Sequence, residues 1–126
     1  MSLSGLLDDA ESLPTRGEEM TLQEITDADF EAEVLASDVP VLVEWWATWC
    51  GPCRQVGPVL ERIADERAGS LRVVKMDQDA HPVQSAAHRV MGVPTMILFR
   101  DGAPILQMTG ARTKAAIERA VDAALE

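Results

Sequence analysis

The sequence predicts an α/β domain in which helices cover both faces of a central, mixed five-stranded sheet. Short apolar runs, typical of strands, alternate along the chain with longer segments whose apolar residues have the spacing of a helix. These elements follow the order βαβαβα and then ββα, which predicts a mixed sheet between layers of helix. A length of 126 residues is enough for one hydrophobic core and too short for two.

Five segments are predicted to be strands. The clearest is a near-continuous apolar run after Pro40, of the kind found in strands that are buried on both faces. Asp101 and Gly102 form a turn signal between the last two strands, which predicts a hairpin. The predicted strands are Thr21–Ile25, Val41–Trp46, Leu71–Met76, Thr95–Phe99 and Pro104–Met108.

Four segments are predicted to be helices. Thr26 and Thr113 are good N-cap residues for the first and the last of them, and Pro82 occupies a favoured first position in the third. The last helix carries its apolar residues on one stripe. The predicted helices are Asp27–Ala36, Cys50–Arg67, Pro82–Arg89 and the segment that follows Thr113.

The composition argues against several classes of function. The chain has 21 acidic and 11 basic residues, a formal net charge of −10, whereas nucleic-acid-binding surfaces need clustered Lys and Arg. Its apolar runs are far shorter than the roughly 20 residues of a membrane-spanning helix. We therefore expect neither a nucleic-acid nor a membrane partner. Separately, we expect the protein to be cytoplasmic and monomeric.

Residues 1–20 differ from the rest of the chain. They contain five acidic residues and one basic residue, and they lack the basic and apolar regions of a secretory signal peptide. We expect them to be an acidic, flexible extension of a single domain formed by residues 21–126.

Cys50 and Cys53, the two cysteines of the chain, lie at the junction between a predicted buried strand and the long helix. The start of a helix presents unpaired N–H groups and the positive end of its dipole, which lower the pKa of a thiol there. Two intervening residues leave the cysteines close enough to form a small disulfide ring. The alternatives are an inert buried pair or half of a zinc site. For zinc, the other candidate ligands, His81 and His88, fit no common spacing. The pattern therefore favours redox chemistry without a bound metal.

Over Thr21–Leu125 the chain resembles the thioredoxin family. The motif Trp-Cys-Gly-Pro-Cys, followed some forty residues later by Val-Pro-Thr, is very specific, whereas a lone Cys-x-x-Cys is not. The residues that carry the resemblance are Val43–Cys53, Pro58, Lys75–Asp77, Gly92–Thr95, Asp101, Gly102 and Gly110.

The resemblance implies the thioredoxin fold and the reduction of protein disulfides. In that scheme Cys50 is the nucleophile that attacks the disulfide of a client protein, and Cys53 resolves the resulting mixed disulfide. A motif with Gly-Pro between the cysteines, rather than one with His, favours a reductant over an oxidant or isomerase. The implied partners are client proteins and a thioredoxin reductase that supplies electrons from NADPH, so that the chain itself binds no cofactor.

Glu44 is a charged residue within the predicted buried strand, where an unpaired charge is unfavourable. Its carboxylate either reaches solvent or is a desolvated carboxyl of raised pKa that relays the proton of Cys53. The family usually has Asp at this position, so the longer Glu changes the reach of the carboxyl group. Lys75, on the neighbouring strand, is either the partner of Glu44 or a solvated lysine at a strand end.

A second group of residues is expected to bind substrate. The resemblance implies a cis bond between Val93 and Pro94 that lies opposite the two sulfur atoms, although a proline that simply opens a strand is the alternative. Trp49, next to the nucleophile, is expected to be partly exposed. The flat, uncharged docking surface would consist of Trp49, Gly51, Pro52, Val93, Pro94, Gly110 and Ala111.

A different class of function remains open at this point. The fold would then serve as a protein-binding subunit in which redox activity is incidental and residues 1–20 supply the specificity. Turnover of a protein disulfide that depends on Cys50 distinguishes the two hypotheses.

Overall fold

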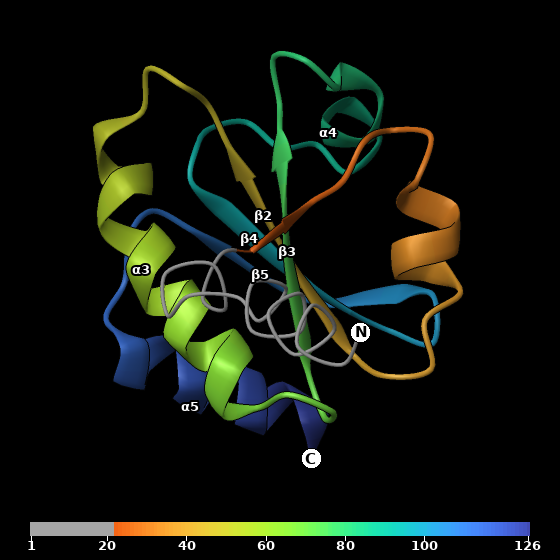
Figure 1. Cartoon of the computed structure of the whole chain (residues 1–126), viewed down its shortest axis with the longest axis vertical. Helices are drawn as coiled ribbons and strands as arrows, with labels where there is room; N and C mark the ends of the chain where they lie inside the picture. The colour runs from red at the N-terminus through yellow and green to blue at the C-terminus, as the bar shows by residue number, and fades with distance from the viewer. Residues whose placement is uncertain (1–21) are drawn as a thin grey trace, which may run out of the picture.

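A mixed sheet organises residues 22–126, which are the residues that the computed structural model describes (Figure 1). The predicted extension at residues 1–20 and Thr21 lie outside them. The strands lie in the order β1-β3-β2-β4-β5, and their bounds are β1 (Gln23–Glu24), β2 (Val41–Trp46), β3 (Arg72–Asp77), β4 (Thr95–Arg100) and β5 (Ala103–Thr109). β1, β3 and β2 pair in parallel, whereas β2, β4 and β5 pair antiparallel. The predicted α/β domain with a five-stranded mixed sheet is confirmed.

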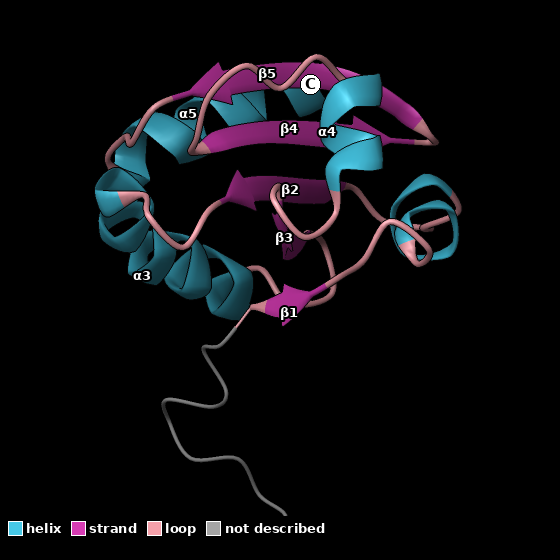
Figure 2. Ribbon diagram, turned by 90° about the horizontal axis from the view of Figure 1, so that it is seen from above, coloured by secondary structure: helices cyan, strands magenta, loops and turns pink. Residues whose placement is uncertain are grey.

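Helices cover both faces of this sheet, as predicted (Figure 2). Viewed along the sheet, α3 and α5 lie on one face, and α4 and η1 lie on the other. The helical segments are η1 (Glu31–Leu35), α3 (Gly51–Glu66), α4 (Pro82–Ala87) and α5 (Lys114–Leu125). In this described part of the chain, no helix is long and apolar enough to cross a membrane.

The alternation of side chains along β2 divides the core into two clusters. Val43 and Trp45 belong to the cluster that includes Phe30 of the η1 side, whereas Leu42 packs with residues of α3 and α5. Since successive side chains of a strand point to opposite faces, Glu44 shares the face of Leu42. The sheet therefore directs the one charged residue of β2 towards α3.

The first helix differs from its prediction of Asp27–Ala36. Thr26 and Asp29 exchange hydrogen bonds between side chain and backbone, at 3.2 and 3.3 Å, in the turn before the helix. The N-cap residue of the helix itself is Phe30, so the prediction of Thr26 as its cap is wrong. The ordered turns that follow are a short π-helix, η1, in which the N–H of Ala36 donates to the carbonyl of Glu31 at 2.9 Å. The prediction of an α-helix is wrong because the spacing of apolar residues does not reveal the hydrogen-bond pattern. It fits backbone hydrogen bonds between residues four apart, as in an α-helix, and between residues five apart, as in a π-helix.

The remaining boundaries lie within two residues of their predicted positions. α4 ends at Ala87 rather than at Arg89, because Arg89 has the left-handed backbone conformation (φ 56°) that ends a helix. Asp101 and Gly102 both have positive φ, at 54° and 80°, and form the predicted two-residue turn between β4 and β5. Thr113 caps α5 as predicted, since its hydroxyl accepts the N–H of Ala116 at 3.1 Å.

Candidate active site

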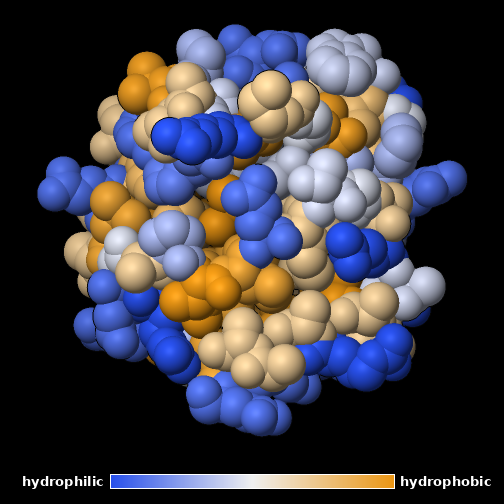
Figure 3. Space-filling model, turned by 180° about the vertical axis from the view of Figure 1, so that it is seen from behind, coloured by the Kyte–Doolittle hydropathy of each residue, from blue (hydrophilic) through white to orange (hydrophobic). Residues whose placement is uncertain are grey.

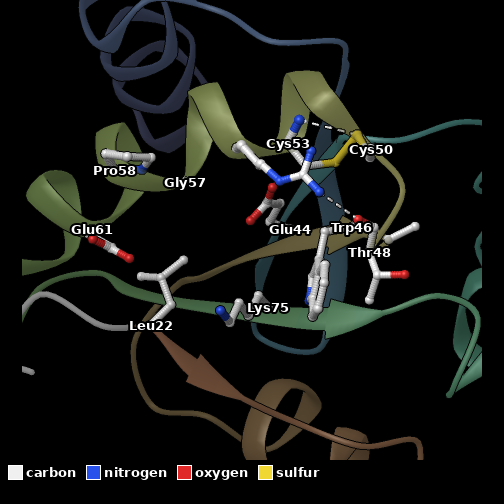
Figure 4. Close-up of a pocket in the computed structure, with 12 residues that line it drawn as sticks. Leu22, Glu44, Trp46, Thr48, Cys50, Cys53, Gly57, Pro58, Glu61 and Lys75 are labelled. Atoms are coloured by element: carbon white, nitrogen blue, oxygen red, sulfur yellow. Dashed lines mark hydrogen bonds between the residues drawn. A yellow bond between two sulfur atoms is a disulfide. The ribbon is translucent and has the colours of Figure 1, made fainter.

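The two cysteines lie where β2 gives way to α3, and they form a disulfide bond. Cys50 has an extended backbone conformation and is the N-cap residue of α3, whose first turn contains Cys53. The backbone N–H of Cys53 donates a hydrogen bond of 3.1 Å to Sγ of Cys50 (Figure 4). A hydrogen bond to this sulfur and the positive end of the helix dipole both stabilise negative charge on it.

Burial does not distinguish the two sulfur atoms in this oxidised form. The exposed fraction is 3% for Cys50 and 7% for Cys53. The difference between them is electrostatic, because the N-cap position gives Cys50 the hydrogen bond that would stabilise a thiolate. This geometry supports the expected division between a nucleophile and a resolving cysteine.

The histidines have local roles away from this disulfide. His81 is the N-cap residue of α4, and Nδ1 of His88 lies 3.1 Å from the carbonyl oxygen of Gln84. The His88 ring also packs against the rings of Phe30, Trp45 and Phe99, and this aromatic cluster was not predicted from the sequence. Across residues 22–126, no three His, Cys, Asp or Glu side chains are grouped as a metal site would require.

Glu44 is buried beneath α3, with an exposed fraction of only 2%. Its Oε2 atom is enclosed and has no hydrogen-bond partner. Burial is the main reason that the pKa of Glu44 rises from 4.5 to about 7; the positive charge of Lys75 opposes this rise and the negative charge of Glu61 adds to it. The alternative of a carboxylate that reaches solvent is therefore wrong, and Glu44 is the desolvated carboxyl that the other interpretation required.

Lys75 is paired with Glu44 in the register of the parallel strands β2 and β3. Its ammonium group nevertheless forms no ion pair with the Glu44 carboxylate; it lies over the ring of Trp46, with Nζ 5.3 Å from the ring centroid. The anticipated partnership is thus a longer-range electrostatic one. The alternative of a freely solvated lysine is not observed either, because the side chain is half-buried.

A cavity of about 320 Å³ connects these groups to the disulfide (Figure 4). Glu44 enters it from β2, Lys75 from β3, and Glu61 and the cysteines from α3. At one side the guanidinium of Arg54 donates to the carbonyl oxygen of Thr48 at 2.9 Å. The lining residues are Leu22, Glu44, Trp46, Ala47, Thr48, Cys50, Cys53, Arg54, Gly57, Pro58, Glu61 and Lys75.

Trp49 is exposed beside the disulfide, as expected for a contact residue, with an exposed fraction of 64%. Its indole Nε1 donates a hydrogen bond of 2.9 Å to Oδ2 of Asp79, in the loop after β3. The sequence carries no signal for Asp79, because thirty residues separate it from Trp49. This hydrogen bond restricts the orientation of an otherwise exposed ring.

The loop before β4 lies next to the cysteines. The peptide bond between Val93 and Pro94 is cis, as the resemblance implied. Val93 packs against the small cluster of Ala47 and the two cysteines, and the carbonyl oxygen of Pro94 accepts the N–H of Gly110 at 2.8 Å. Of the other residues expected in the docking surface, Gly51, Pro52 and Ala111 are exposed and Gly110 is half-buried. Pro94 is buried, so the prediction that it forms part of this surface is wrong.

The molecular surface seen from behind mixes polar and apolar side chains (Figure 3). Three large apolar side chains of the described residues are strongly exposed: Trp49, Val83 and Met91. Met91, which lies two residues before Val93, was not singled out from the sequence. Its exposed thioether adds an apolar group close in the chain to the cis bond.

Comparison with known proteins agrees with this geometry. A family model described as Thioredoxin matches residues 21–123. The thioredoxin of Mycobacterium bovis is 50% identical over 105 residues, which is 83% of this chain and 90% of the relative. The thioredoxin of Porphyra purpurea is 41% identical over 99 residues, 79% of this chain and 92% of the relative. A bifunctional thioredoxin reductase/thioredoxin of Mycobacterium leprae is 52% identical over 96 residues, 76% of this chain and 21% of that protein.

Proposed function

Because the chain belongs to the thioredoxin family, we propose that it reduces the disulfides of client proteins in the cytoplasm and is then reduced again by a thioredoxin reductase. Its activity as a thiol–disulfide oxidoreductase follows from the family and from the disulfide between Cys50 and Cys53. The direction of electron flow, the partners and the role of each residue are the proposal. The observation that carries it is the hydrogen bond from the Cys53 N–H to the sulfur of Cys50.

In the first step the thiolate of Cys50 attacks one sulfur atom of the client disulfide. A bond forms between Sγ of Cys50 and that sulfur, the client disulfide breaks, and the other client sulfur leaves as a thiolate that takes a proton from water. The N–H of Cys53 and the start of α3 stabilise the attacking anion. Trp49, Val93 and the backbone near Gly110 form the surface on which the client docks.

In the second step Cys53 resolves the mixed disulfide. Its thiol gives a proton to the carboxylate of Glu44, its sulfur bonds to Sγ of Cys50, and the client sulfur leaves as a thiolate. Two electrons have then passed from the cysteine pair to the client. Support for Glu44 as the base comes from the cavity that it shares with Cys53 and from its pKa of about 7, which suits a group that exchanges protons near neutral pH.

The reductase that returns electrons to the disulfide is proposed to use NADPH, and this chain is proposed to need no bound cofactor of its own. Support comes from the Mycobacterium leprae relative, whose name places a thioredoxin reductase and a thioredoxin in one protein. A cytoplasmic location is consistent with this, because a dithiol reductant is maintained in compartments where thiols are kept reduced.

Catalysed reduction of a disulfide-containing protein by NADPH and a thioredoxin reductase tests the proposal. Cys50→Ser should abolish turnover, and Cys53→Ser should accumulate a mixed disulfide between Cys50 and the client. The second variant is a matched control, because it removes one thiol from the same turn but leaves the proposed nucleophile. Unchanged turnover in Cys50→Ser would restore the hypothesis of a binding subunit, which family membership does not favour.

A further inference from the structure

Glu61 is a second carboxylate in the cavity that holds Glu44. It lies on α3, about two helical turns beyond Cys53, and is half-buried. Figure 4 places Glu61 on the α3 side and Lys75 on the β3 side of the space into which Glu44 projects. Within residues 22–126, no ion pair neutralises the charge of Glu61.

The two charged neighbours of Glu44 act in opposite directions. A negative charge at Glu61 disfavours a second negative charge at Glu44, whereas the positive charge of Lys75 favours it. Both effects are strengthened because Glu44 is buried, with little water to screen its charge. Neither neighbour forms a hydrogen bond or an ion pair with the Glu44 carboxylate, so each acts on it through its charge.

The other charged side chains near this cavity are not placed around Glu44 as Glu61 and Lys75 are. Arg54 of α3 is hydrogen-bonded to the carbonyl oxygen of Thr48, beside the disulfide. Glu24 of β1 is the register partner of Lys75 on the side away from Glu44, and it is exposed. On the other side of β2, strand β4 places the uncharged residue Met96 opposite Glu44. Among the described residues, Glu61 is therefore the one carboxylate besides Glu44 that lines the cavity.

We propose that Glu61 is a positioning residue for the reaction: together with Lys75, it sets how readily Glu44 takes up the proton of Cys53 and releases it again. This inference rests on the proposed role of Glu44 and deepens it. With Glu61 charged, Glu44 exists in both protonation states near neutral pH. A proton relay needs both states, because it accepts a proton in one cycle and must release that proton before the next. Loss of this charge leaves Glu44 more fully ionised and a weaker base.

The direct test is an NMR titration of the Glu44 carboxyl carbon in the full-length oxidised protein, where neither cysteine titrates. Glu61→Gln should lower the pKa of Glu44 by about half a unit, an order of magnitude set by a unit charge acting across a partly desolvated gap. Glu61→Asp, which retains the charge, should keep most of the wild-type value. Lys75→Met should shift the pKa of Glu44 in the opposite direction.

Glu31→Gln is the matched control, because it removes one carboxylate from the exposed surface of η1 on the opposite face of the sheet. It should leave the titration of Glu44 unchanged. An unchanged titration in Glu61→Gln, or an equal shift in Glu31→Gln, would overturn the proposal, since the effect would then be absent or would reflect net charge alone.

The role in the reaction has a separate readout. The pH profile of mixed-disulfide resolution should move to lower pH in Glu61→Gln by the same amount as the Glu44 titration. A shifted titration with an unchanged pH profile would overturn the positioning role. The titration of Glu44 does not depend on whether Glu44 relays a proton. A negative titration result would therefore contradict this inference alone, whereas the Cys50→Ser experiment tests the proposed function.

Discussion

Glu44 and Lys75 are opposite each other in the register of β2 and β3, yet the lysine ammonium lies over the ring of Trp46 and not against the buried carboxylate. The carboxylate thus has a cation nearby but not in contact. Burial therefore outweighs the attraction of Lys75, and the pKa of Glu44 rises to about 7. This balance has consequences for both stability and catalysis.

The stability of the oxidised protein should fall as the pH rises from about 4.5 to about 7. Glu44 has a higher pKa in the folded state than its ordinary value of 4.5, so the folded state binds more protons than the unfolded state in this interval. The loss should be on the order of 3 kcal/mol in the free energy of unfolding. Urea denaturation at pH 5 and pH 8 measures it.

Glu44→Gln is the control for this stability effect. The variant keeps the size of the side chain but cannot ionise, so it should lack this part of the pH dependence and should be more stable than the wild type at pH 8. Every other titratable group is the same in both proteins, so the difference between the two curves isolates Glu44. Parallel curves would contradict the raised pKa.

Glu44→Gln should also slow the second step of the reaction. Without a carboxylate in the cavity that Cys53 lines, the thiol must lose its proton directly to water. General-base assistance typically contributes about 100-fold or more. Attack by Cys50 on the client should remain near its wild-type rate. Rapid-quench kinetics with a single client disulfide separates the two steps, and normal resolution in this variant would exclude Glu44 as the base.

Asp79→Ala should weaken client docking. The variant removes the acceptor of the Trp49 indole N–H, so the exposed ring loses its preferred orientation. We expect KM for a disulfide-containing client to rise by about threefold, with little change in kcat, because a single exposed hydrogen bond contributes modestly. Asp79→Asn retains an acceptor oxygen and should behave like the wild type; an equal rise in KM there would assign the effect to charge.

Tryptophan fluorescence should report the redox state through Trp46. Its side chain packs against the cluster of Ala47, Cys50 and Cys53, whereas Trp45 belongs to the cluster on the opposite face of the sheet. Trp46→Phe should therefore remove most of the emission change on reduction. Trp45→Phe, the matched control, should retain it, and the reverse pattern would contradict the placement of these two rings.

Several features were predictable because they depend on residues that are close in the chain. β2 has the predicted bounds of Val41–Trp46, since an apolar run between Pro40 and the polar loop permits few other structures. The turn at Asp101 and Gly102 and the cap at Thr113 depend equally on local backbone chemistry. The π-helix at Glu31–Leu35 was not predictable, because its apolar spacing also fits an α-helix.

The α/β fold and the position of the cysteine pair at the start of a helix could be predicted from the order of the amino acids. The packed structure was needed to show that Glu44 is enclosed and that Lys75 lies over Trp46. It was also needed to show that Asp79 accepts a hydrogen bond from the Trp49 indole and that Glu61 shares the cavity. The reason is physical: a strand or cap depends on neighbours within a few residues, whereas the charge state of a buried carboxyl depends on distances between elements that meet only when the sheet and α3 pack together.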